Sequence, residues 1–225
     1  MSARGSSAMR QRTSLKMIRR SPSFARQLAG VEALEDRRLL SVNPQLIRDI
    51  NFSADESFAE LNGQLYFANQ DGAGVELWSS DGTAGGTALF ADLLAGSSSS
   101  DPGEFVATSN TLFFVADEGG FGLGGTRQVW KSDGTVGGTQ TLTDLEGDFF
   151  VQTNPGKLTV VGNQVFFQAG TATNGRELWV TDGTTGGTSM VVDLSPGSTF
   201  IGSPRSSRFG ELVDFGGTLF FTKWG

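Results

Sequence analysis

The chain has 225 residues, a net charge of −7, and neither a histidine nor a cysteine. The lack of histidine excludes imidazole-based catalytic triads and histidine-ligated zinc or haem. The lack of cysteine excludes thiolate nucleophiles, disulfides and iron–sulfur clusters. Any chemistry must therefore come from carboxylates, hydroxyls, amides, lysine or arginine.

The two ends of the chain differ in charge. Residues 1–40 hold nine Arg and Lys against three acidic residues, whereas the remaining 185 residues hold eight basic and 21 acidic residues. We divide the chain into a basic leader, residues 1–45, and a repeat domain, residues 46–225, which is long enough to bury its own core. The acidic balance of the repeat domain argues against a nucleic-acid partner. No apolar run approaches the length of about 18 residues that a transmembrane span needs.

The leader lacks the apolar core of a secretory signal in residues 1–22. Its composition favours disorder. Phe24, Leu28, Val31 and Leu34 fall at helical spacing after Ser23 and indicate a short amphipathic helix within it. The segment that follows, residues 34–41, reads Leu-Glu-Asp-Arg-Arg-Leu-Leu-Ser.

Three segments of the second region align without gaps. They are ELWSSDGTAGGTALFADL from Glu76, QVWKSDGTVGGTQTLTDL from Gln128, and ELWVTDGTTGGTSMVVDL from Glu177. A short aromatic run recurs before each segment and once more near the end of the chain: QLYF, TLFF, QVFF and TLFF. A period of about 50 residues indicates a repeat architecture.

Each repeat is predicted to form four short strands. Asn62-Gly63, Ser109-Asn110, Gly162-Asn163 and Gly216-Gly217 supply the turn between the first two strands. The Trp strand and a fourth strand ending in Asp-Leu follow. We therefore predict an all-β, β-propeller-type array of four-stranded antiparallel blades, with repeats at about 57–95, 104–147, 156–196 and, in part, 210–225. Residues 46–50 match a fourth strand alone and bring the predicted total to fifteen strands, one short of four blades. The departure from the repeat at residues 222–225 predicts an incomplete ring.

Two resemblances follow from these strings. The repeat resembles the ELWxxDGT family of bacterial surface and secreted proteins. Residues 34–41 resemble the LEPR-XLL sorting segment of large exported proteins, with Asp36 in place of the proline. Together they imply an exported, extracellular or cell-surface protein, and no catalytic residue carries over from either family.

The repeated acidic loops are the strongest candidate sites. The first residue of each glycine-rich loop is an aspartate that could hold calcium: Asp81, Asp133 and Asp182. Calcium is the only cofactor that the sequence suggests. We expect instead that each fixes a turn, because glycine and threonine stand where a calcium loop places further oxygen ligands. Further repeated positions are predicted to be structural: Gly82, Gly134 and Gly183 in the loops, and Asp92, Asp144 and Asp193 at the ends of the fourth strands.

Trp78, Trp130 and Trp179 have two interpretations: platforms on which sugars stack, or filling between neighbouring blades. We expect packing, and expect any glycan contact to fall on loops that differ between repeats. Residues 120–125 satisfy GxGxxG, but a strand follows where nucleotide binding requires a helix.

The sequence thus predicts no catalytic residue and a non-enzymatic module for interaction or adhesion, with protein or glycan partners at the cell surface. The alternatives are a glycan-cleaving propeller enzyme, a calcium-dependent lectin-like propeller, and a structural spacer.

Overall fold

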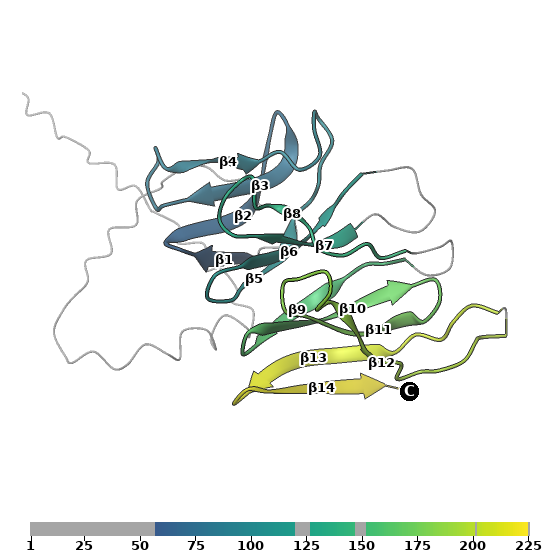
Figure 1. The fold of residues 1–225 in the computed structure, drawn as a ribbon. Coiled ribbons are helices and arrows are strands. Elements are labelled where there is room, and N and C mark those ends of the chain that lie inside the picture. The colour runs from purple at the N-terminus through teal and green to yellow at the C-terminus, as the bar shows by residue number, and fades with distance from the viewer. Residues whose placement is uncertain (1–56, 120–126, 147–151, 201, 225) are drawn as a thin grey trace, which may run out of the picture. The chain divides into compact units, whose positions relative to one another are not determined.

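The computed structural model describes residues 57–119, 127–146, 152–200 and 202–224 (Figure 1). This part of the chain forms antiparallel sheets and contains no helix, so the all-β prediction is confirmed. The first sheet contains β1 (Phe58–Leu61), β2 (Gln64–Asp71), β3 (Gly74–Ser80) and β4 (Thr87–Ala91). The second contains β5 (Gly103–Ala107), β6 (Leu112–Asp117), β7 (Arg127–Ser132) and β8 (Gln140–Thr141).

The third sheet contains β9 (Gly156–Val161), β10 (Gln164–Thr171), β11 (Gly175–Thr181) and β12 (Ser189–Val192). The fourth has two described strands, β13 (Arg208–Phe215) and β14 (Thr218–Trp224). Strands within each sheet neighbour each other in chain order. Each repeat of the sequence therefore corresponds to one sheet.

The turn between the first two strands of a sheet has the predicted positive φ at both residues in two of the four repeats. Asn62 and Gly63 both have positive φ, as a type I′ turn requires, and so do Gly216 and Gly217. Ser109 and Asn110 differ, because neither has a positive φ. Thr108 N donates to Thr111 O at 2.9 Å across them, so the turn stays tight, although β5 ends at Ala107 and β6 begins at Leu112.

Two predicted strand limits are wrong. Residues 222–224 continue β14, paired with β13 as far as Arg208 opposite Trp224, so they still belong to the second strand of the fourth repeat. The fourth strands end before the repeated Asp-Leu: β4 ends at Ala91 and β12 at Val192. Their ladders stop because the next leucine N–H groups donate to a side chain of the third strand, described below.

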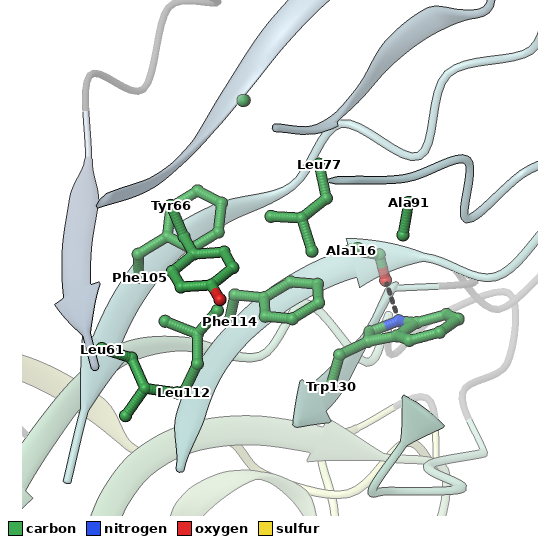
Figure 2. Packing of buried hydrophobic residues seen from close by; sticks show 10 residues of the cluster. Leu61, Tyr66, Leu77, Ala91, Phe105, Leu112, Phe114, Ala116 and Trp130 are labelled. Atoms are coloured by element: carbon green, nitrogen blue, oxygen red, sulfur yellow. Dashed lines mark hydrogen bonds between the residues drawn. The ribbon is translucent and has the colours of Figure 1, made fainter. Parts of the chain in front are cut away.

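The core lies between consecutive sheets. The first strands β1, β5, β9 and β13 lie beside one another in that order. The first interface buries Leu61, Tyr66 and Leu77 of the first sheet against Phe114 and Trp130 of the second (Figure 2). Phe114 and Trp130 stack with ring centroids 6.2 Å apart. The second interface repeats the pattern, with Phe113 and Val129 against Phe167.

Several predictions fall outside the described residues. These are the leader, the strand match at residues 46–50 and the GxGxxG string at 120–125. Within the described residues the four sheets do not close into a ring. No helix in the described ranges is long and apolar enough to cross a membrane.

Candidate functional site

The first residue of each ELW motif is buried and ties three segments together. Glu76 and Glu177 are fully buried and Gln128 is nearly so. The Glu76 carboxylate accepts from Leu93 N at 2.8 Å, from Ser100 N at 2.8 Å and from Ser100 Oγ at 2.6 Å. It therefore holds both the end of the fourth strand and the segment that enters the next sheet.

Glu177 repeats this arrangement in the third sheet. It accepts from Leu194 N at 3.0 Å and from Ser207 Oγ at 2.8 Å. In the second sheet, the Gln128 side chain accepts from Leu145 N at 3.0 Å and donates to Leu145 O at 3.0 Å. Buried charges are costly unless they are paired or hydrogen-bonded, so these carboxylates serve the fold and are not available to a ligand.

The Asp-Gly-Thr loops form the same turn in all three sheets. Asp81 Oδ1 accepts from Thr83 N at 2.8 Å and from Thr83 Oγ1 at 2.7 Å. Thr83 Oγ1 in turn accepts from Gly86 N at 2.9 Å. A Cβ on Gly86 would collide with the Asp81 carboxylate. Asp133 and Asp182 make the corresponding bonds to Thr135 and Thr184, which is the turn geometry expected from the sequence.

These hydrogen bonds set the charge state of the loops. The bonds from the side chain and backbone of the following threonine lower the pKa of Asp81, Asp133 and Asp182 below the usual 3.8. All three carboxylates are fully exposed and ionised at neutral pH. They stabilise their own turns as acceptors of local donors.

The second and third of these loops also lie against the preceding sheet. Gly134 of the second sheet lies next to Tyr66, whose pKa is raised by burial and by the charge of Asp133. In the third sheet, Gly183 lies against Phe113, and its carbonyl accepts from Lys131 Nζ at 2.7 Å. The loops therefore help to join neighbouring sheets.

Calcium needs six to eight oxygen ligands gathered around one point. No three acidic side chains of the described residues lie close enough together to hold an ion. Oδ1 of each loop aspartate already accepts two hydrogen bonds. The loop geometry thus favours the turn interpretation, and calcium binding stays a prediction to be tested by titration.

The second set of repeated aspartates lies just after the fourth strands. Asp92 and Asp144 are exposed, and Asp193 is partly exposed, with its Oδ1 accepting from Ser195 N at 3.0 Å. Residues two positions later differ between the repeats: Leu94, Glu146 and Ser195. Of these three residues, Glu146 lines a cavity together with Trp179.

The three repeated tryptophans have unequal environments. Trp78 and Trp130 are 3% and 9% exposed, and Trp130 Nε1 donates to Ala116 O at 3.2 Å (Figure 2). Trp179 stacks on Phe167 with ring centroids 6.4 Å apart, but it is only partly buried. Packing thus accounts for Trp78 and Trp130, whereas one side of Trp179 is open.

Trp179 lines a cavity of about 460 Å³ between the second and third sheets. Residues 142–146, after β8, form one wall, and the turn between β10 and β11, residues 171–174, forms another. Thr185 and Thr188 of the third glycine-rich loop complete it. The volume falls within the range of about 300–1,000 Å³ that is usual for small-molecule sites.

The cavity combines apolar and polar groups. Leu142, Leu145 and Trp179 are its apolar part. Asp144, Glu146 and Asn174 also line it, and between described residues no hydrogen bond occupies their side chains. The site therefore offers an aromatic face together with carboxylate and amide groups that can meet a ligand.

Two features of the fold were not predicted from the sequence. One is the serine or threonine three residues before a glycine at the start of each later sheet, Ser100, Thr153 and Ser207; its spacing recurs and could have been detected. The other is Glu104, which stands at the position of Lys157 in the next sheet and whose carboxylate accepts from Lys157 N at 3.0 Å. The cavity could not be predicted as a whole, because its walls come from segments of two different repeats; the break in the repeat at Glu146 was its one signal in the sequence.

No protein-family model matches this chain, and no curated protein matches it significantly.

Proposed function

We propose that this chain is an exported, non-enzymatic repeat protein of the propeller type, which acts as an interaction or adhesion module outside the cell or at its surface and binds glycans. The proposal rests on a difference among the polar residues: some are hydrogen-bonded within the fold, and others are open to a ligand. Repeated groups such as Glu76, Glu177 and Asp81 are occupied by hydrogen bonds within the fold. Around the cavity, Glu146 and Asn174 do not recur in the other repeats, and they stand beside the repeated Asp144 and Trp179.

The arrangement of the sheets supports the propeller part of the proposal. In propellers, the first strand of every blade lies nearest the axis and beside the first strands of its neighbours. Here β5 lies beside β1, and β9 lies beside both β5 and β13. The aromatic residues between consecutive sheets repeat in the same way.

The resemblance to the ELWxxDGT and LEPR-XLL segments supports export. Cell fractionation with an antibody against the repeat domain tests it. The protein is expected outside the cytoplasm, in the surface or extracellular fraction. Recovery in the cytoplasmic fraction alone would contradict the proposal.

The glycan-binding part is tested by incubating the full chain with insoluble neutral and acidic polysaccharides. Two quantities are measured: protein retained after washing, and sugar released into solution. We expect retention without release. Release that a single Asp or Glu substitution abolishes would make the protein a glycan-cleaving enzyme, and retention on no polysaccharide would contradict glycan binding.

A further inference from the structure

We infer that the cavity beside Trp179 is a saccharide subsite that selects neutral pyranose rings and rejects acidic ones. This inference rests on the proposed glycan-binding function and gives it a location. Its starting point is a difference between two equivalent interfaces of the repeat.

At the first interface, an apolar residue stands at the equivalent position. Leu94 follows Asp92 by two residues, and its side chain lies against Gly119, where an added Cβ would collide with a Leu94 methyl group. Trp130, the tryptophan of this interface, is 9% exposed. At this interface, therefore, an apolar side chain packs against the backbone at Gly119, and the tryptophan is nearly buried.

At the second interface, Glu146 stands at the position of Leu94, and Ala172 stands at that of Gly119. Ala172 N donates to Glu146 O at 2.9 Å, so the two segments are in contact here as well. A charged side chain does not fill an apolar gap without a partner, because desolvating it is costly. The space beside Trp179 stays open and becomes the cavity.

The groups around the cavity match a pyranose. The C–H face of a sugar ring is apolar and packs on an indole face, while its hydroxyls both donate and accept hydrogen bonds. Trp179 provides the aromatic face. Asp144, Glu146 and Asn174 provide acceptors and donors at the same site.

Charge decides which sugars can enter. The described residues that line the cavity include two carboxylates and no lysine or arginine. A uronate or sulfated ring would bring a further negative charge close to Asp144 and Glu146, and like charges at short range repel. Neutral rings avoid this repulsion and can donate their hydroxyl protons to the carboxylates.

Isothermal calorimetry on the full chain tests the inference with cellotriose, laminaritriose, mannotriose and trigalacturonate, each up to about 10 mM. We expect at least one neutral trisaccharide to bind and trigalacturonate not to bind. Glu146→Leu, which places the residue type of the first interface beside the cavity, and Asp144→Ala should each weaken binding about tenfold or more. Asp92→Ala, at the equivalent exposed position of the first sheet, should leave the affinity unchanged.

Trp179→Phe keeps an aromatic packing partner for Phe167 and is expected to weaken binding less than Glu146→Leu, with a melting curve close to that of the unaltered chain. The inference is contradicted if the Glu146→Leu variant folds normally and binds the neutral trisaccharide as tightly as the unaltered chain. It is equally wrong if trigalacturonate binds as well as the neutral sugars, or if no neutral trisaccharide binds. Polysaccharide retention that survives Glu146→Leu would leave the proposed function standing and remove only this site.

Discussion

The first and second interfaces between sheets have aromatic residues at the same positions of the repeat, but the tryptophan is buried at the first and only partly buried at the second. At the first, Leu94 packs against Gly119, and the Trp130 indole is buried. At the second, Glu146 takes the equivalent position, and Trp179 lines an open cavity. A repeated tryptophan is thus buried in one copy and lines a cavity in the next, where a residue that does not repeat stands beside it.

Removing the two tryptophans in turn should change stability the most. Trp130→Ala should lower the free energy of unfolding by about 3–5 kcal/mol, since it empties a closed core and removes the bond to Ala116 O. Trp179→Ala should cost about 2 kcal/mol, because one face of this indole is already open. Urea denaturation of both variants measures the difference, and equal losses would mean that the interfaces do not differ.

The next largest effect on stability is expected from Glu76, the buried carboxylate of the first sheet. Glu76→Ala removes the acceptor of three donors, two of them on Ser100, and should cost about 3 kcal/mol in urea denaturation. Glu76→Gln, which copies the residue found at Gln128 in the second sheet, should cost only about 1 kcal/mol. If Glu76→Gln lowered the free energy of unfolding as much as Glu76→Ala, glutamine could not replace glutamate in the first sheet as Gln128 does in the second.

The glycine-rich loop beside the cavity offers a matched pair. A Cβ on Gly187 would collide with the Asp182 carboxylate, whereas a Cβ on Gly186 would meet open space. Gly187→Ala is therefore expected to destabilise by about 1–3 kcal/mol, and Gly186→Ala to change stability by about 0.5 kcal/mol or less. Thermal melts compare the two, and a neutral Gly187→Ala would contradict the turn geometry.

A weaker effect is a dependence of stability on acidity. The pKa values of Asp81, Asp133 and Asp182 are lowered in the fold, so their stabilisation is complete above their usual value of 3.8 and is lost as the pH falls through the folded values. Replacing all three by Asn should flatten the fall in melting temperature below about pH 4. An unchanged acid slope would mean that these carboxylates do not stabilise the turns.

Much of the fold could be predicted from the sequence because the repeat displays it several times. The spacing around the tryptophans indicates the strands, and Asn62-Gly63 indicates a turn type, since few residues tolerate its two positive φ values. The limits of the fourth strands could not be predicted in this way. Their ladders end where buried side chains, such as Glu76, replace the backbone as acceptors for the leucine N–H groups.

The candidate site could be predicted only in part. The repeat marks Trp179 as a recurring aromatic residue and Asp144 as a recurring aspartate, but their meeting with Glu146 and Asn174 in one cavity depends on how two sheets pack. Glu146 breaks the repeat where Leu94 stands in the first copy. Such a break was the available signal, yet its importance is clear only once Leu94 lies against Gly119.

A crystal structure of the chain with the tightest-binding neutral trisaccharide would locate the bound sugar and so decide between the two interfaces. We expect a pyranose ring against the open face of Trp179, within hydrogen-bond reach of Asp144, Glu146 or Asn174, and no sugar beside Trp130. A ring bound at the first interface, or on the glycine-rich loops away from Trp179, would contradict the saccharide site.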